Sequence, residues 1–560
     1  MKYQPHRLSL ALAACLMCSS ALVAAQPVAS DNATANLIRL LVEQGVLQPE
    51  QAASLLKQAQ DEASSATKGS VAQPGDVRVP YIPVTVRDQI REEVKAEVMA
   101  TAKQENWAAP NTFPDWVSRI TVDGDVRVRW ENRGFSSKNS PYIVDVAKLN
   151  QSSPFLFGVY DANGNQTGNV SVPLLNTRKD RNNQYRFRAR IGFTANISDQ
   201  WSAGIRLASG SNKSPVSTSD NFGGGFSKKS FWLDQAYLRW SPTDWAQLTA
   251  GRADNPFVST DILFSKDLNL DGFSAAFKRP LNNTDITLRS TLGAYLIDNT
   301  YNSGMSSVAD SEGETKTKWL LGAQVGADWK INHEQTLSAD LAYYTYRNIA
   351  GVLSEPCDYL DTSCSTDWSS PSFIQKGNSL FLIRDVIPPI YQAGSTYQML
   401  GLASRFNLLD LNLGWKGRVG NGLGLQVSGN YIRNLAYSKN SIEDRVRHSE
   451  LVTNIENGHF RSGGNAWTIH TALGKDYRVR DRGDWQVFAG YKYIQPDAVP
   501  DAYNDSTFHM GGTNAKGYYL GGAYAIEKDV VAQLRWMSSR EIYGSPLSIN
   551  IMQLELNARF

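Results

Sequence analysis

The sequence contains few cysteines, few histidines and, after its first 25 residues, no long hydrophobic run. Four of its 560 residues are Cys and six are His, and the histidines are not spaced as metal ligands are. No G-x-S-x-G or H-E-x-x-H motif occurs, so we expect no catalytic residue, no metal and no cofactor. Past residue 25 no stretch approaches the ~20 apolar residues of a membrane-spanning helix, so any membrane span must consist of strands.

The first 25 residues have the features of an export signal. Lys2 and Arg7 precede an apolar stretch, and small residues follow it at 23–25. We expect cleavage before Gln26. The segment 12–15, Leu-Ala-Ala-Cys, also resembles a lipoprotein processing site, but it would leave a very short apolar core. Removing the signal leaves 54 basic and 54 acidic residues, so no global positive field favours nucleic acid as a partner.

Two cysteines remain in the mature chain, Cys357 and Cys364. They lie in a stretch rich in Asp, Ser and Thr that reads as a loop. In an exported protein this spacing predicts a local disulfide.

Residues 26–116 have helical periodicity and read as a periplasmic helical and linker region. One helix is expected over 35–63, and a second over 84–107 after a polar linker and two prolines. The second helix has an apolar stripe with charged residues opposite it. Packing in the periplasm explains this stripe better than a coiled coil, because it covers too few heptads.

From Arg119 the periodicity changes from 3.6 to 2. In 120–130 apolar residues alternate with Thr, Asp and Arg, and the same pattern returns in 184–197 and 548–560. A soluble sandwich could contain one such strand. Repetition over some 440 residues, with Trp at strand ends, instead predicts that 117–560 form an all-β transmembrane domain, an antiparallel outer-membrane β-barrel.

The pattern gives about sixteen strands, an even number, as a single-chain bacterial barrel requires. Short and long connections alternate between them, which places both ends of the barrel domain on the periplasmic side. The expected strands span 119–133, 183–197, 200–210, 230–241, 244–252, 270–279, 283–297, 317–331, 334–347, 404–418, 422–436, 463–476, 484–496, 515–527, 529–541 and 546–560.

The last strand resembles the C-terminal signal that Gram-negative outer-membrane proteins present to the barrel-assembly machinery. Its alternate positions are apolar and its final residue is aromatic. The residues that form this signal are Met552, Leu554, Leu556, Ala558 and Phe560.

Several motifs resemble the "Putative porin" family of Gram-negative outer membranes. They are Ala250–Phe257, Asp267–Gly272, Asp484–Tyr491, Pro496–Val499 and Gly511–Tyr518. The resemblance implies a channel in the cell outer membrane, in contact with membrane lipid and lipopolysaccharide, that passes small hydrophilic solutes. Sixteen-strand porins are usually homotrimers.

A barrel of about sixteen strands is too wide for side chains to fill, so we expect a water-filled lumen. In porins of this size the loop after strand five commonly folds inward and narrows the channel. Counting strands makes this loop 253–269 here. Its charged residues are Asp254, Asp261, Lys266 and Asp267.

An inward-facing basic stripe is expected on the first four strands, because residues two apart share one face of a strand. Arginines stay charged at physiological pH, so such a stripe opposite the acidic loop would favour small polar or anionic solutes. Structural ion pairs with Asp123, Asp125 and Glu131 are an equal alternative, and the two interpretations are compatible. The arginines are Arg127, Arg129, Arg186, Arg188, Arg190, Arg206 and Arg239.

Other functions fit the sequence less well. A surface adhesin or receptor could use the long loops 134–182 and 348–403, but their polar composition is common to extracellular loops. A plugged transporter would need a globular domain before the first strand, and the helical region there does not have that pattern.

Overall fold

The computed structural model describes residues 115–168, 172–179, 182–299, 316–361, 363–389, 392–447 and 454–560. The predicted signal peptide (1–25) lies outside these residues. So do the predicted helices 35–63 and 84–107, apart from 53, 54, 57, 92–95 and 98, which are helical. The chain divides into two units, Met1–Pro114 and Asp115–Phe560, and the second forms the barrel.

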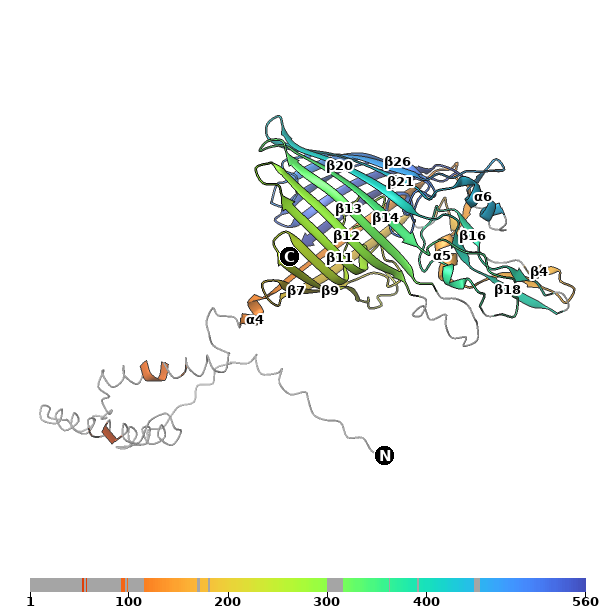
Figure 1. Ribbon diagram of the computed structural model, residues 1–560, viewed down its shortest axis with the longest axis horizontal. Coiled ribbons are helices and arrows are strands. Elements are labelled where there is room, and N and C mark those ends of the chain that lie inside the picture. The colour runs from red at the N-terminus through yellow and green to blue at the C-terminus, as the bar shows by residue number, and fades with distance from the viewer. Residues whose placement is uncertain are drawn as a thin grey trace, which may run out of the picture. The chain divides into compact units, whose positions relative to one another are not determined.

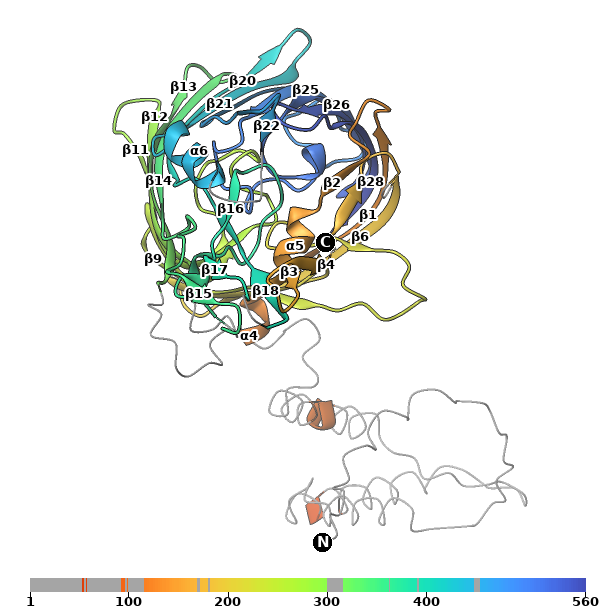
Figure 2. The ribbon, with the colours of Figure 1, turned by 90° about the vertical axis from the view of Figure 1, so that its right-hand side faces the viewer.

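Sixteen antiparallel strands form a closed barrel (Figures 1 and 2). The last strand pairs with the first, Val126 opposite Ala558, which closes the sheet. Each predicted strand corresponds to one observed strand with ends within about three residues, so the predicted fold is confirmed. The barrel strands are β1 (Ile120–Phe135), β6 (Asn183–Asn196), β7 (Trp201–Ala208), β9 (Trp232–Thr243), β10 (Ala246–Asp254), β11 (Asn269–Pro280), β12 (Ile286–Asp298), β13 (Lys318–Lys330), β14 (Thr336–Arg347), β20 (Asn407–Val419), β21 (Leu423–Asn434), β24 (Asn465–Gly474), β25 (Trp485–Ile494), β26 (Ala515–Glu527), β27 (Val530–Glu541) and β28 (Ser548–Arg559).

The period-2 pattern separates a lipid-facing surface from a polar interior. In β1, Val126 and Val128 are 47% and 46% exposed, whereas Asp125 and Glu131 are buried inside the barrel at 6% and 1%. The apolar face is stabilised by contact with lipid, whereas a carboxylate placed in lipid would lose its hydrogen-bond partners. The sequence pattern therefore dictates which face points inward.

Tryptophans mark the end of the barrel where the short turns lie. Trp201 stacks on Trp240 with ring centroids 5.8 Å apart, and Trp245 and Trp329 are exposed near the same end. Aromatic side chains of this kind anchor a barrel at the membrane interface. The helix α4 (Asp115–Ser118) and the C-terminus also lie at this end, opposite α5, α6 and β18 (Figure 1). No helix in the described part of the chain is both long and apolar enough to cross a membrane.

The long loops at the other end fold over the mouth of the barrel (Figure 2). Strands from two distant loops pair there, with Thr396 opposite Gly158. Beneath them an apolar cluster that includes Phe257, Leu400 and Val499 fills part of the barrel interior. The elements of these loops are β2 (Tyr142–Val144), α5 (Val146–Gln151), β3 (Phe155–Tyr160), β4 (Gln166–Gly168), β5 (Leu174–Asn176), β8 (Asp220–Asn221), β15 (Cys357–Asp358), η2 (Asp367–Ser369), β16 (Leu380–Leu382), β17 (Val386–Ile387), β18 (Gly394–Gln398), β19 (Leu400–Leu402), α6 (Lys439–Arg447), β22 (Ile455–Glu456), β23 (His459–Phe460) and η3 (Phe508–Met510).

Candidate functional site: the arginine-lined lumen

The loop after the fifth barrel strand folds into the lumen. It spans 255–268, slightly less than the predicted 253–269, because Asp254 is still the last residue of β10. The Val258 amide donates to Gln324 Oε1 at 2.8 Å, and Gln324 Nε2 donates back to the Val258 carbonyl at 2.7 Å. Further along, Thr260 Oγ1 donates to Asn430 Oδ1 at 2.8 Å. The loop is therefore fixed to the inner wall at β13 and β21.

Apolar packing holds the same loop against one side of the barrel. Phe257 and Phe264 meet the Tyr344 ring edge-on, at centroid distances of 5.1 and 5.5 Å. Tyr344 is fully buried. This packing fills one side of the lumen and leaves the polar space beside β1, β6, β25, β27 and β28.

Two further loops meet the constriction loop inside the lumen. The Asp505 amide donates to the Asp261 carbonyl at 2.9 Å, and the Ser265 amide donates to the Tyr503 carbonyl at 2.7 Å. Ser265 Oγ also donates to the Val216 carbonyl at 3.0 Å. The constriction is thus built from 209–219, 255–268 and 495–514 together, whereas the sequence predicted only the second.

Two of the family motifs, Pro496–Val499 and Gly511–Tyr518, could have drawn attention to the 495–514 loop, because they lie in it or at its end. In the structure Asp497, Asn504 and Thr513 of this loop are almost completely buried. Polar residues this deeply buried must be hydrogen-bonded, which indicates a folded lumenal loop. The 209–219 loop has no comparable signal.

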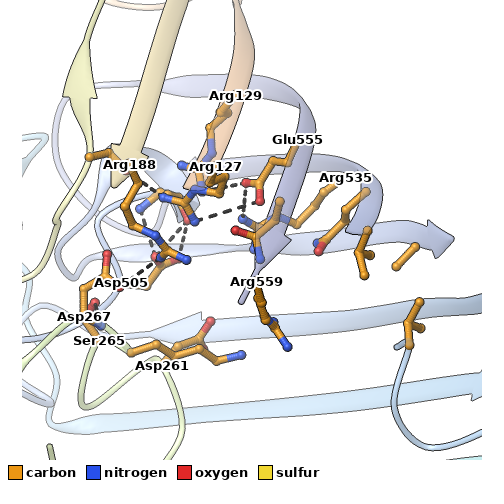
Figure 3. A pocket seen from close by; sticks show the side chains of 18 of the residues that line it. Arg127, Arg129, Arg188, Asp261, Ser265, Asp267, Asp505, Arg535, Glu555 and Arg559 are labelled. Atoms are coloured by element: carbon orange, nitrogen blue, oxygen red, sulfur yellow. Dashed lines mark hydrogen bonds and ion pairs between the residues drawn. The ribbon is translucent and has the colours of Figure 1, made fainter. Parts of the chain in front are cut away.

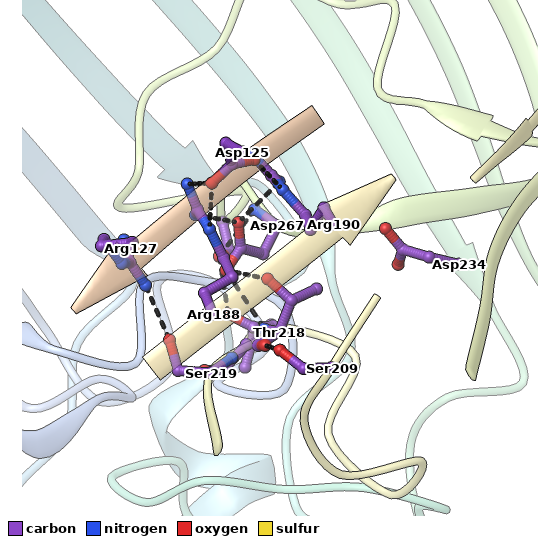
Figure 4. A network of polar contacts seen from close by, with 12 residues as sticks. Asp125, Arg127, Arg188, Arg190, Ser209, Thr218, Ser219, Asp234 and Asp267 are labelled. Carbon is purple, nitrogen blue, oxygen red and sulfur yellow. Dashed lines mark hydrogen bonds and ion pairs between the residues drawn. The ribbon is translucent and has the colours of Figure 1, made fainter. Parts of the chain in front are cut away.

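Arg188 and Arg190 form the centre of a buried ion-pair network (Figure 4). Arg188 Nη2 lies 2.6 Å from Asp125 Oδ2, and Arg190 Nε lies 2.6 Å from Asp125 Oδ1. On the loop side, Asp267 Oδ1 lies 3.3 and 3.4 Å from the two guanidinium groups. The Thr218 amide donates to Asp267 Oδ2 at 3.2 Å. The network ties the constriction loop to the β6 wall.

Asp267 remains ionised in this network. Burial alone would raise the pKa of its carboxyl group, but the charges of Arg188 and Arg190 and the Thr218 amide hold that pKa below its usual value. The sequence analysis named three carboxylates on the first strand as alternative ion-pair partners of the arginines. Of these three, only Asp125 pairs with Arg188 and Arg190. Glu131 instead pairs with Arg133 at 2.7 Å.

A second basic group lies around one carboxylate of the last strand. Arg129 Nη2 is 2.6 Å from Glu555 Oε1, whereas Arg127 and Arg535 approach Glu555 only to 3.9 Å. Arg127 Nη2 also donates to Ser219 Oγ at 2.6 Å. One carboxylate therefore faces three guanidinium groups.

The remaining predicted arginines lie apart from these two groups. Arg206 pairs with Asp234 at 2.7 Å and with Asp254 at 3.5 Å. The guanidinium carbon of Arg239 lies 4.8 Å from the centre of the Tyr237 ring. Arg186 lines a cavity nearer the barrel mouth. The predicted single stripe is thus divided into several groups.

Three adjoining cavities run through the lumen. The inner chamber, about 810 Å³, lies toward the short turns and is lined by Arg127, Arg129, Asp267 and Arg559 among others (Figure 3). The side chamber, about 770 Å³, shares Arg190, Asp261, Lys266 and Arg535 with it. The outer chamber, about 720 Å³, meets the inner one at Ser217 and Ser506.

The inner chamber carries an excess of positive charge. Among the described residues nine Arg and Lys line it against five Asp and Glu. Lys266 of the loop is one of the nine. Asp261 is paired, 2.7 Å from Lys492 Nζ on β25. Sequence reasoning missed Asp505, Arg535, Glu555 and Arg559, although the period-2 pattern of β27 and β28 places the last three on the inward face.

The cysteines and the terminal residue Phe560 do not line the three chambers. Cys357 and Cys364 form a disulfide within the loop after β14, with Cα atoms 5.9 Å apart. Phe560 extends the pairing of β28 with β1, since its amide donates to the Gly124 carbonyl at 3.1 Å. A Cβ atom at Gly124 would collide with the Phe560 ring. On the outer surface Met552, Leu554 and Leu556 are exposed, with Ala558 following in the same register.

A closed sixteen-strand barrel with an apolar outer band and a charged lumen is the architecture of an outer-membrane channel. The chain belongs to the family described as "Putative porin", whose sequence profile matches residues 31–560. This membership places the protein in the outer membrane, and the family and fold are those of a channel rather than of an enzyme.

Solved structures with a similar chain path include outer-membrane proteins of low sequence identity. The channel DcaP of Acinetobacter baumannii is 10% identical, with 79% of this chain and 97% of that chain covered and a TM-score of 0.34. OprB of Pseudomonas putida is 10% identical, with coverages of 79% and 95% and a TM-score of 0.39. OmpF of Salmonella typhi is 10% identical, with coverages of 79% and 97% and a TM-score of 0.35. No curated protein matches the sequence.

Proposed function

We propose that the protein is a channel for passive diffusion of small hydrophilic solutes and that it favours anions. The observation that carries this proposal is the excess of basic over acidic residues around the inner chamber. Arginine cannot lose its proton at physiological pH, so the excess is permanent. A lumen lined by one sign of charge lowers the energy of the opposite ion inside it.

The excess is concentrated where pairing is incomplete. Asp125 and Asp267 together balance Arg188 and Arg190. In contrast, Arg127 and Arg535 share Glu555 with Arg129, which is much closer to it. Arg559 projects toward the same chamber (Figure 3). We therefore assign the anion preference to these less fully paired arginines of β1, β27 and β28.

The remaining proposals concern partners. The apolar outer surface supports contact with membrane lipid and lipopolysaccharide, and Phe560 with its strand supports recognition by the barrel-assembly machinery. The proposal that the protein forms a homotrimer rests on the family resemblance. The adhesin alternative has less support, because the long loops pack on one another, with Asn150 Nδ2 donating to the Pro371 carbonyl at 2.8 Å.

Single-channel recording of residues 26–560 in planar bilayers under a KCl gradient tests the proposal. We expect stable conductance steps and a zero-current potential that favours chloride. Arg127→Gln and Arg559→Gln should each lower the anion-to-cation permeability ratio by about fivefold, because one charge about 5 Å from a permeating ion contributes about 0.5 kcal/mol after screening, and anions and cations shift in opposite directions.

Arg482→Gln is the matched control. Its side chain is 76% exposed in a short turn and lies 3.8 Å from Glu527, so it should leave the ratio unchanged. A zero-current potential that favours cations would refute the anion preference but would still support a channel. Folded protein that conducts no ions would refute the channel itself and favour the surface-binding alternative.

A further inference from the structure

Three aromatic side chains from neighbouring strands form a continuous group on the lumen wall. They are His470 on β24, Phe488 on β25 and Tyr519 on β26, and all three line the side chamber. Their ring centroids lie 5.9 to 6.5 Å apart. The His470 and Tyr519 planes are nearly parallel, inclined by 19°. We call this group the aromatic shelf.

Two glycines allow the shelf to lie flat against the wall. Gly490 stands opposite Tyr519 in the sheet register, and Gly521 stands opposite Phe488. A Cβ atom at Gly490 would collide with the Tyr519 ring, and one at Gly521 with the Phe488 ring. Each ring therefore covers a glycine on the neighbouring strand. One face of each of these two rings rests on the wall. Lys492 Nζ lies over the Tyr519 ring, 5.5 Å from its centroid, so the Phe488 ring is the better placed of the two to receive a solute.

Cationic side chains stand beside the shelf in the same chamber. Arg535 is directly opposite Gly521 on the next strand, so it adjoins the position that Phe488 covers. It donates through Nε and Nη2 to the neutral amide oxygen of Gln553 at 3.0 and 2.7 Å. Its nearest carboxylate contact, Glu555, is 3.9 Å away. The positive charge of Arg535 is thus poorly neutralised. Other cations around this chamber are Arg190, Arg206, Lys266 and Lys492, of which Lys492 is paired with Asp261 at 2.7 Å.

The polar groups of the shelf are already in use. Tyr519 Oη and His470 Nδ1 are hydrogen-bonded to each other at 2.9 Å, and Thr468 Oγ1 donates to the Tyr491 carbonyl at 3.0 Å. The shelf itself therefore offers a solute an apolar ring face next to a guanidinium group.

We propose that the side chamber is a binding subsite for small aromatic carboxylates, with the ring on the aromatic shelf and the carboxylate toward Arg535. This inference rests on the proposed anion-favouring channel and names its solute class. The chamber volume of about 770 Å³ is within the range of small-molecule sites. Ring stacking separates such solutes from aliphatic anions of the same charge.

Isothermal titration of the detergent-solubilised full mature chain with benzoate and with acetate tests the inference without requiring conductance. Benzoate should bind about five- to tenfold more tightly than acetate. Phe488→Leu keeps an apolar side chain but removes the ring, and it should lower the benzoate-to-acetate affinity ratio about two- to tenfold. Phe488→Trp, which keeps an aromatic face, should retain a ratio above that of the Leu variant.

Tyr518→Leu is the matched control, because Tyr518 neighbours Tyr519 in sequence but is 46% exposed on the opposite, outer face. It should leave the ratio unchanged. Equal affinities for benzoate and acetate in the unmodified protein would overturn the inference, as would an unchanged ratio in folded Phe488→Leu. Loss of the ring-dependent ratio in a channel that still favours chloride would refute the subsite alone. A ring-dependent ratio in protein that does not conduct would refute only the proposed channel.

Discussion

Asp267→Asn should increase anion preference and loosen the constriction loop. The Asp267 carboxylate is the charged contact between this loop and the β6 arginines, 3.3 Å from Arg188 and 3.4 Å from Arg190. It also accepts hydrogen bonds from the Thr218 amide and hydroxyl. The substitution keeps the shape of the side chain and removes its charge, so the change tests electrostatics rather than packing.

Two magnitudes follow from the geometry. Hydrogen bonds to charged groups contribute about 1.5–3 kcal/mol, and we expect a loss of stability in that range. This loss of stability is smaller than the cost of leaving a buried charge without any ion-pair partner, because Asp125 still pairs with both arginines. For an ion about 5 Å from the carboxylate, the Coulomb energy in water is about 0.8 kcal/mol and about 0.5 kcal/mol after screening in 0.1 M salt. Because anions and cations shift in opposite directions, the permeability ratio should rise about fivefold.

The assay is the zero-current potential under a KCl gradient, combined with thermal unfolding followed by gel migration of the folded barrel. Asp254→Asn is the control, because its carboxylate is 68% exposed and lies 3.5 Å from Arg206. We expect a smaller change in both measurements for this variant. If Asp267→Asn has the permeability ratio and the stability of the unmodified protein, the network neither sets the field nor holds the loop.

Two further predictions concern assembly and pH. Deleting Phe560 should lower the amount of folded protein in the outer membrane, because it removes the terminal aromatic residue and its two backbone hydrogen bonds with Gly124; unchanged levels by membrane fractionation would argue against the assembly signal. Asp501 in the 495–514 loop is almost fully buried, with an exposed fraction of 1%. Burial raises the pKa of Asp501 to about 7. The folded state therefore binds the proton more tightly than the unfolded state, and stability is full below about pH 4 and falls as pH rises through 7, by at most about 4 kcal/mol. Asp501→Asn should reduce the difference in melting temperature between pH 5 and pH 8, and a difference as large as that of the unmodified protein would contradict this.

The barrel was predictable because its physics is local and repetitive. A strand in lipid must alternate apolar and polar residues, and each strand must be long enough to cross the membrane. Segments such as 120–130 and 548–560 therefore reveal their structure without reference to any partner. Counting the strands was enough to place the loop after the fifth barrel strand at 253–269, and the structure shows that residues 255–268 fold into the lumen.

The lumen was less predictable because its contacts are not periodic. Nothing in the sequence around Val216 indicates that it meets the constriction loop, and the motifs near Asp505 do not say which loop it contacts. The partner of Arg188 and Arg190 on that loop is Asp267, and neither the Asp267–Arg188 nor the Asp267–Arg190 distance could be inferred from spacing. The inward direction of the arginines follows from the strand period, but their pairing depends on how three loops fold together.

The two interpretations of the arginines can be assigned to different parts of the wall. On β6 the guanidinium groups of Arg188 and Arg190 are matched by two carboxylates, Asp125 and Asp267, so this group is close to neutral and mainly holds the loop. Around Glu555 three guanidinium groups face one carboxylate, and Arg559 adds a further charge to the same chamber. If the channel favours anions as proposed, these arginines of β1, β27 and β28, together with Lys266 and Arg478, would supply the positive charge of the inner chamber, whereas Arg188 and Arg190 on β6 mainly hold the loop.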